Sequence, residues 1–309
     1  MNRRECLRLA AGGGAALAFV PSGLFLAGRS LPNPIGCSAI SWRDQEFPSA
    51  LKTIAALGFQ GVQMLDWVTH ANQGELAGEL AHQLAELKLQ PVILSAHKLT
   101  LDPARPEDEA TKLRTDAEFF QKLGGHYLQV TDGGDPDRHY SRDVMASFGE
   151  RLNHLGEVAG EYGLELGYHP HDRTLGETRE GLGQVLAGTD PARVKLIADV
   201  AHLALGGSDP AEVIRTYHQR LIAVHFKDVR RQVLELARRD HNLERSTEFR
   251  FCEVGQGALD FPAILDVFRE VRFQGWVIFE LDSYEPRAGG PRTSVEMNRD
   301  AARRLGFRI

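Results

Sequence analysis

Short apolar runs alternate along this chain with longer segments in which apolar residues recur every three or four positions. The short runs have the length and composition of β-strands, and the longer segments have the period of amphipathic α-helices. Eight strands are predicted, at residues 35–41, 61–65, 91–96, 126–131, 164–169, 194–199, 221–226 and 275–281. Helices are predicted at residues 47–57, 75–87, 107–123, 142–162, 210–217, 261–271 and 295–305.

The order of these elements predicts the architecture. Gly58, Gly124 and Gly163 stand where helices should stop before the next strand, and glycine supplies the left-handed residue needed there. The weakest helical pattern, at residues 176–186, is short and interrupted by glycine. Regular strand–helix alternation without a linker predicts an α/β fold, a single-domain (β/α)8 TIM barrel. An open doubly wound sheet is the alternative, but the usual glycine-rich phosphate loop does not follow the first strand.

The amino terminus has the pattern of an export signal. Arg3 and Arg4 precede an apolar run at residues 9–27 that contains no acidic residue. Paired arginines indicate the twin-arginine route, so residues 1–30 are predicted as the signal and residues 31–309 as the barrel. An uncleaved membrane anchor is the alternative, but its glycines and Pro21 make a poor membrane helix. We therefore expect cleavage near Ala27, a periplasmic enzyme and no stable membrane association afterwards.

The composition of the chain limits the kinds of partner that we expect. The chain is 42% hydrophobic and 25% charged with a net charge of -6, which is typical of a soluble globular protein and argues against nucleic acid as a partner. Cys6 leaves with the predicted signal. Cys37 and Cys252 are expected as buried or free thiols, although a disulfide between them stays open. A homo-oligomer is also left open.

Four polar signatures each follow an apolar run: Tyr168-His169-Pro170-His171, Asp199-Val200-Ala201-His202, His225-Phe226-Lys227-Asp228 and Phe279-Glu280-Leu281-Asp282. In a parallel barrel the carboxyl ends of all strands lie at one end. Histidine and carboxylate side chains delivered to one point are the ligands of a divalent metal site. The sequence therefore predicts a metal-dependent enzyme.

Three further segments carry a family resemblance: residues 224–230, 255–261 and 275–280. In order and spacing they resemble the xylose-isomerase-like TIM barrels, and within them inosose dehydratase and the relatives known as sugar phosphate isomerases. That superfamily contains sugar isomerases, epimerases, keto-sugar dehydratases and an endonuclease branch. The resemblance covers about the whole chain after the signal.

The resemblance implies the metal ligands. Asp199, His225 and Glu280 match the family's ligands on the sixth, seventh and eighth strands. The fifth position departs from the pattern, because His169 stands where many members have Glu. Imidazole and carboxylate ligands together suit one divalent transition metal ion. We expect Mn²⁺ first, with Co²⁺, Fe²⁺ or Zn²⁺ as alternatives.

Such a metal would stabilise the enediolate that forms when a base removes the proton beside a carbonyl. The family's epimerases use two glutamates, of which Glu280 alone remains here. The predicted catalytic residues are therefore Glu280 and, as a base suited to neutral pH, His171 or His202. Substrate contacts are predicted for His97, Lys227, Arg230, Trp42 and Trp67.

Some of these residues have structural alternatives. Lys227 and Arg230 are equally suited to ion pairs with Asp228 or Glu253, and the tryptophans to core packing.

The function expected is that of a sugar isomerase or epimerase acting on a keto-sugar or cyclitol. One alternative is an inosose-dehydratase-like lyase that eliminates a β-hydroxyl or β-alkoxide. Another is a periplasmic sugar-binding protein without catalysis, which need not keep a metal constellation. An endonuclease is disfavoured by the negative charge and the export signal. Export also favours a free sugar over a phosphorylated one as the small-molecule partner.

Overall fold

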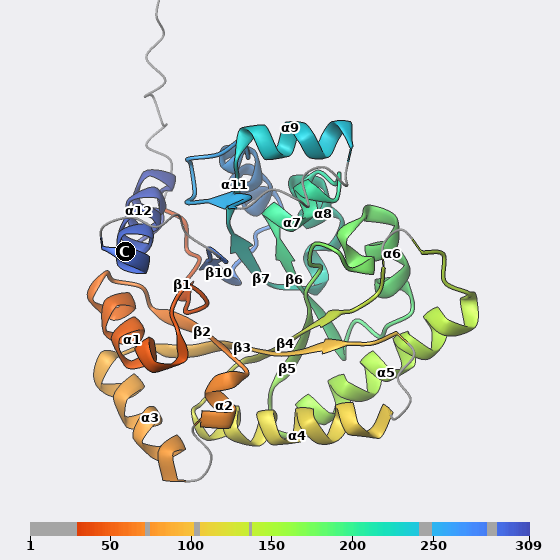
Figure 1. Ribbon diagram of the computed structural model, residues 1–309, viewed down its shortest axis with the longest axis horizontal. Coiled ribbons are helices and arrows are strands. Elements are labelled where there is room, and N and C mark those ends of the chain that lie inside the picture. The colour runs from red at the N-terminus through yellow and green to blue at the C-terminus, as the bar shows by residue number, and fades with distance from the viewer. Residues whose placement is uncertain (1–29, 72–74, 102–105, 136–137, 241–248, 283–288) are drawn as a thin grey trace, which may run out of the picture.

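A closed barrel of parallel strands forms the centre of the protein (Figure 1). The computed structural model describes residues 30–71, 75–101, 106–135, 138–240, 249–282 and 289–309. Around the barrel the strand order is β1-β10-β7-β6-β5-β4-β3-β2. The strands are β1 Ile35–Ser38, β2 Gly61–Leu65, β3 Gln90–Leu99, β4 Tyr127–Asp132, β5 Glu165–Tyr168, β6 Val194–Asp199, β7 Leu221–Phe226 and β10 Trp276–Phe279. The predicted TIM barrel is confirmed.

Helices surround the barrel on its outside (Figure 1). They are α1 Phe47–Ala56, α2 Trp67–Ala71, α3 Glu75–Leu87, α4 Pro106–Lys122, α5 Arg142–Glu161, α6 Arg179–Ala187, α7 Val200–Leu205, α8 Pro210–Tyr217, α9 Arg231–Arg239, α11 Phe261–Glu270 and α12 Gly290–Leu305. The helix predicted at residues 176–186 instead begins at Arg179. Residues Leu175–Glu177 form a separate 3-10 turn. Thr178 follows this turn and caps the helix, because its side chain accepts a hydrogen bond from the Gly181 amide.

A two-stranded antiparallel ribbon lies outside the barrel sheet and was not predicted. It pairs β8 Asp228–Val229 with β9 Phe251–Cys252. The Asp228 carboxylate fixes the ribbon to the loop that follows it, because it accepts hydrogen bonds from the backbone amides of Gly255, Gly257, Ala258 and Leu259. The ribbon follows directly from β7 and therefore stands at the carboxyl end of the barrel.

The barrel interior changes from apolar to polar along the strands. Ile93, Ile197, Ala223 and Ile278 pack together in one buried cluster. Residues two positions further along each strand face the same side, because side chains alternate between faces. Those positions hold polar side chains: Ser95, Asp199, His225 and Glu280. An apolar plug therefore supports a polar layer at the carboxyl ends of the strands.

The loop after β5 is tied to the loop after β4. The Tyr168 hydroxyl donates to Asp132 Oδ2 at 2.6 Å, and the Leu175 amide donates to Asp132 Oδ1 at 2.7 Å. Asp132 also accepts from the Gly134 amide, as its place in a glycine-rich turn predicts. A Cβ on Gly176 would collide with the Tyr168 hydroxyl. These contacts fix the segment that carries His169.

The two thiols are separate. Cys37 and Cys252 are both free and buried, and burial raises the pKa of the Cys37 thiol far above its usual range.

No helix in the described part of the chain has the length and apolar character needed to cross a membrane. The predicted export signal at residues 1–30 lies, except for Ser30, outside the described residues.

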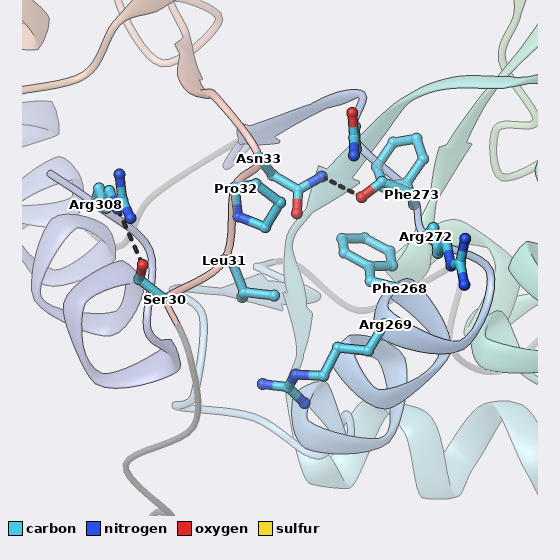
Figure 2. Close-up of a pocket in the computed structure, with 10 residues that line it drawn as sticks. Ser30, Leu31, Pro32, Asn33, Phe268, Arg269, Arg272, Phe273 and Arg308 are labelled. Carbon is cyan, nitrogen blue, oxygen red and sulfur yellow. Dashed lines mark hydrogen bonds between the residues drawn. The ribbon is translucent and has the colours of Figure 1, made fainter.

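A cavity of about 610 Å³ lies at the amino end of the barrel (Figure 2). Its lining comes from the segment before β1, the end of α11, the approach to β10 and the carboxyl terminus. Leu31, Phe268 and Phe273 give it an apolar wall, and three arginines also line it: Arg269, Arg272 and Arg308.

Candidate metal centre

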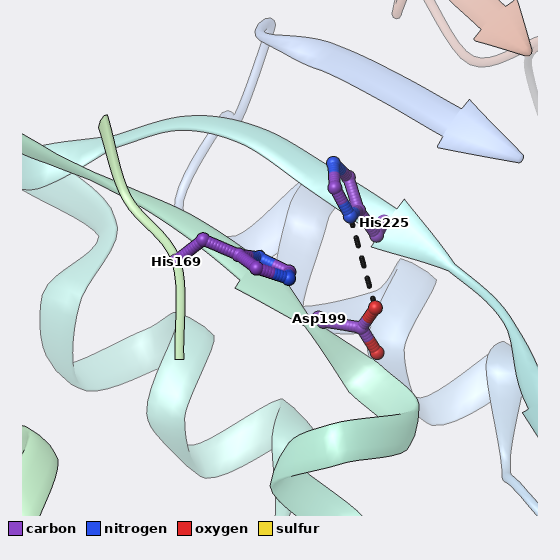
Figure 3. Close-up of side chains that lie close together, drawn as sticks. All are labelled: His169, Asp199 and His225. Atoms are coloured by element: carbon purple, nitrogen blue, oxygen red, sulfur yellow. Dashed lines mark ion pairs between the residues drawn. The ribbon is translucent and has the colours of Figure 1, made fainter. Parts of the chain in front are cut away.

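Three side chains from neighbouring strands point toward one another at the carboxyl end of the barrel (Figure 3). His169 follows β5, Asp199 ends β6 and His225 lies on β7. One potential ligand atom from each residue lies within 4.8 Å of the others, and all three residues are buried. Convergence of two imidazoles and a carboxylate at one buried point is the arrangement of a transition-metal site.

Asp199 is held in place by the helix that it starts. Its Oδ1 accepts hydrogen bonds from the backbone amides of Ala201 at 2.8 Å and His202 at 3.0 Å, as the N-cap of α7. Oδ2 is the second oxygen, and it lies 3.7 Å from His225 Nδ1. Oδ2 is buried and has no hydrogen bond within the part of the chain that the structure describes. The cap therefore orients one oxygen so that the other faces the cluster.

His225 has the strongest signature of a ligand. Its ring is fully buried, and neither Nδ1 nor Nε2 has a hydrogen-bond partner among the described residues. The distances from Nδ1 to Asp199 Oδ2 and Glu280 Oε1, 3.7 Å and 3.6 Å, are too long for hydrogen bonds. Because buried polar atoms rarely stay without partners, His225 Nδ1 and Asp199 Oδ2, which face each other, fit a metal ion.

His169 and Glu280 are each fixed by a supporting contact. His169 Nδ1 lies 3.2 Å from the Ile197 carbonyl oxygen, which leaves Nε2 for a metal. Gln63 Nε2 donates to Glu280 Oε2 at 2.9 Å, which leaves Glu280 Oε1 facing His225. The three residues carried over from the family resemblance and His169, which departs from it, therefore lie in one layer. In metal proteins such supporting contacts set the orientation of the ligands.

The electrostatic environment gives most of the candidate ligands the protonation state that metal binding requires. Burial and the neighbouring His225 lower the pKa of His169 to about 3, so its imidazole is neutral. Burial opposes ionisation of Asp199 and Glu280, but Lys227 outweighs it and holds the pKa of both carboxyls below the usual range. Burial also opposes a charge on His225, yet Glu280 and Asp199 raise its pKa to about 9. Metal binding would displace that proton.

Lys227 lies in the middle of these acids. Its fully buried ammonium donates to Glu280 Oε1 at 3.1 Å, Asp282 Oδ1 at 2.9 Å and His202 Nε2 at 3.0 Å. An ammonium has three hydrogens, so these bonds use all of them and Asp199 Oδ2, at 3.1 Å, receives none. Lys227 therefore pairs with other acids than the Asp228 or Glu253 that its position suggested.

A second cluster adjoins the first. His171, Asp172 and His202 bring ligand atoms within 4.8 Å of one another. The rings of His171 and His202 lie 3.9 Å apart between centroids. However, Arg250 Nη2 lies 2.7 Å from Asp172 Oδ2 and Lys227 holds His202 Nε2. Arg250 and Lys227 thus each take one atom at the edge of this cluster, while Asp172 Oδ1 and the Nδ1 atoms of both histidines face one another.

The structure places the other predicted substrate contacts differently. His97 lies 3.0 Å from Asp116 of α4, in the helix layer outside the barrel, because a register shift after Ser95 turns it outward. Trp42 and Trp67 join the main hydrophobic core, the latter with its ring edge-on to Phe47. Arg230 Nε donates to the Phe249 carbonyl at 2.7 Å, within the ribbon segment.

Several residues of the site were missed from sequence. Gln63 is a polar residue inside an apolar strand, and that break in the pattern is its signal. Asp282 stands two positions after Glu280, so alternation places both on one face. Asp172 follows His171 directly but has no motif of its own. Arg250 comes from a ribbon that the hydrophobic pattern did not reveal.

Comparison with known proteins agrees with this fold. The inosose dehydratase of Geobacillus kaustophilus (strain HTA426) is 30% identical over 302 residues, covering 89% of this chain and 95% of the relative. That of Lacticaseibacillus casei is 28% identical, covering 83% and 92%. Among solved structures, the IOLI protein with a bound zinc atom has a TM-score of 0.72 at 16% identity, covering 88% of this chain and 98% of that one.

A second solved structure, the probable 3-DHS dehydratase AsbF from Bacillus anthracis, has a TM-score of 0.73 at 15% identity and covers 87% of this chain and 98% of its own. At these identities the two structures establish the fold. The sequence pattern of one family covers residues 51–301, through all but the first strand of the barrel. This chain therefore belongs to the xylose isomerase-like TIM barrel family, whose members include enzymes of sugar chemistry.

Proposed function

We propose that the protein removes water from a cyclic keto-polyol of the inosose type. The single observation that carries this proposal is that His171, a histidine with a free ring nitrogen among the described residues, lies beside the candidate metal ligands. The His171 ring lies 5.8 Å from that of His169 between centroids, and its side chain is 40% exposed. The two curated relatives described above are inosose dehydratases, which supports the same chemistry.

The metal would be held by His169, Asp199, His225 and Glu280. The buried atoms of this set that have no hydrogen bond within the described residues fit an ion. When bound, a divalent transition ion supplies Lewis-acid polarisation of the ketone and the adjacent hydroxyl. The mixed imidazole and carboxylate set favours Mn²⁺, with Co²⁺, Fe²⁺ or Zn²⁺ as alternatives.

Of the two candidate bases, His171 has the open nitrogen. Its Nδ1 lies 3.0 Å from Asp172, and its Nε2 has no partner among the described residues. His202 Nε2 is instead held by Lys227. Burial opposes a charge on His171, but Asp172 outweighs it and raises its pKa above the usual value. His171 can therefore both accept and return a proton near neutrality.

The proposed reaction is balanced in protons. His171 takes the proton beside the ketone, and the resulting enediolate expels the β-hydroxyl as its carbon–oxygen bond breaks. The leaving oxygen takes the proton from His171, which gives water and an unsaturated ketone. Lys227 would stabilise the negative oxygen only by exchanging one of its hydrogen bonds with Glu280 or Asp282.

Isomerisation or epimerisation would use the same enediolate and is the second candidate. Glu280 favours it, because one of the two glutamates typical of the epimerases is present. His169 in place of the other favours elimination instead. A free rather than phosphorylated substrate belongs to the proposal, since we also propose that residues 1–30 direct export to the periplasm.

The test supplies purified protein with Mn²⁺, Co²⁺, Fe²⁺ or Zn²⁺ and a panel of inososes and keto-sugars in D₂O. A dehydratase releases water and forms a product that absorbs in the ultraviolet. An epimerase or isomerase incorporates deuterium without losing water. Binding without exchange, with every metal, would sink both enzymatic proposals and favour a sugar-binding protein. His82→Asn, a change at an exposed histidine of α3, is the matched control and should leave turnover unchanged.

A further inference from the structure

One carboxylate, Asp172, lies between the two histidines of the second cluster. Its Oδ1 is 3.0 Å from His171 Nδ1 and 3.3 Å from His202 Nδ1, and its backbone carbonyl oxygen also lies 3.0 Å from His171 Nδ1. The Asp172 side chain is only 4% exposed. A buried carboxylate placed against two ring nitrogens controls which way both rings face.

The neighbours of His202 determine where its ring hydrogen lies. Lys227 Nζ is 3.0 Å from Nε2, and an ammonium has donors only. Nε2 must therefore accept, and the hydrogen of the neutral ring sits on Nδ1. That atom is buried and has no well-aligned hydrogen bond in the described residues. Asp172 Oδ1 is the carboxylate oxygen beside it, and such contacts often tighten when substrate binds.

The Asp172 carboxylate is itself clamped from outside the barrel. Arg250 Nη2 lies 2.7 Å from Asp172 Oδ2, so it fixes the rotation that turns Oδ1 toward the histidines. Arg250 immediately precedes β9, and the next residue, Phe251, sets its ring edge-on to His202 at 5.2 Å between centroids. The β8–β9 ribbon thus reaches the histidine pair through two consecutive residues.

We propose that Asp172, held by Arg250, is a positioning residue that orients His171 and His202 through their Nδ1 atoms. His171 then presents Nε2 to the substrate, and His202 presents Nε2 to Lys227. This inference rests on the proposed function for the role of His171, but the orientation of the rings can be measured without any substrate.

The first test is long-range ¹H–¹⁵N NMR of metal-free protein labelled at histidine, recorded across pH. We expect the hydrogens of both neutral rings on Nδ1 in the wild type. In Asp172→Asn the ring hydrogens should stay on Nδ1, because Lys227 and the backbone carbonyl of residue 172 still favour that form, but both Nδ1–H signals should move upfield as the charge-assisted hydrogen bonds to the carboxylate are lost. The matched control is Asp266→Asn, which breaks an exposed aspartate–arginine pair on α11 and should change neither ring. Wild-type rings with the hydrogen on Nε2 would overturn the inference.

The second test is kinetic. Asp172→Asn should lower turnover about 10- to 100-fold, the range for lost supporting contacts, with KM and bound metal unchanged. Arg250→Gln should lower turnover less and add little to Asp172→Asn, while Arg250→Lys should recover part of the loss. Loss of metal together with turnover, or fully additive losses, would contradict the positioning role. A wild type that converts no inosose defeats the proposed function, and the NMR result then decides this inference alone.

Discussion

The two ends of the barrel differ in how their polar groups are arranged. At the amino end, a cavity of about 610 Å³ is lined by three arginines, and Figure 2 draws Arg308 and Arg272 on opposite sides of it. Arg308 donates to Ser30 and Arg269 to Asp266, so two of them have local partners. At the carboxyl end, acids, histidines and one lysine converge, and several of their buried atoms have no hydrogen bond to any described residue.

The comparison shows that volume is a poor guide to the functional end. Burying titratable groups is costly unless each has a partner, so a protein keeps such a cluster only where the groups serve each other or a ligand. His225 satisfies neither nitrogen within the described residues. The arginines at the amino end belong to no such buried cluster. Changes at the carboxyl end should therefore have large effects, and changes at the amino end small ones.

The largest effect is expected for Asp199→Asn. Asparagine is as good an N-cap as aspartate, so α7 should stay capped, while the cluster loses its carboxylate. We expect bound metal to fall by more than the roughly 10- to 100-fold typical of supporting residues, and turnover with it. Metal analysis after dialysis, with circular dichroism for the fold, measures both. Full metal occupancy in the variant would remove Asp199 from the ligand set.

Lys227→Met should have the next largest effect, and on stability. Removing the ammonium leaves Asp199, Glu280 and Asp282 buried without their cation. Breaking a buried ion pair from one side typically costs about 3 to 5 kcal/mol. Urea unfolding of the metal-free variant should show this loss, and added Mn²⁺ should restore part of it by supplying positive charge. A metal-free variant as stable as the wild type would show that the acids take up protons instead.

Gln63→Leu should weaken the site without abolishing it. The change removes the donor to Glu280 Oε2 and puts an apolar side chain of similar size in its place. We expect metal affinity to fall about 10- to 100-fold, with turnover recovered at saturating metal. Titration calorimetry gives the affinity. If turnover stays low at saturating metal while affinity is unchanged, Gln63 contacts the substrate rather than the ligand.

The same contrast explains what could be predicted from sequence. The alternation of apolar runs gave all eight barrel strands, because each strand buries a continuous row of side chains. The motifs at the strand ends placed His169, Asp199, His225 and Glu280 together, because parallel strands end on one side. His97 was predicted to reach the pocket, but a register shift in β3 turns it to Asp116. A one-residue shift reverses the face of a strand and has no signature in the sequence.

Contacts between distant segments were beyond sequence patterns. Arg250 and Asp172 lie far apart in the chain and meet only because the ribbon folds over the barrel mouth. Helix ends were partly predictable. Gly58, Gly124 and Gly163 have positive φ as expected, but Lys88 and Arg272 adopt the same left-handed conformation without being glycine. These two residues also follow helix ends, but no glycine marks either position.

The smallest effect is expected for Arg272→Gly at the amino end. Arg272 has φ of 55°, a left-handed conformation that costs an ordinary residue roughly 1 to 2 kcal/mol and glycine almost nothing. The added flexibility of glycine in the unfolded chain offsets part of this gain. We expect a net stabilisation of up to about 1 kcal/mol by urea unfolding.

Metal content and turnover should not change in this variant, although the cavity loses a guanidinium. Lys88→Gly, with φ of 56° after α3, is the matched control, since it relieves the same conformation at a residue that does not line the cavity. Equal stabilisation in both variants with unchanged turnover would support the contrast between the two ends. A loss of turnover confined to Arg272→Gly would instead connect the amino-end cavity to the reaction and break the comparison.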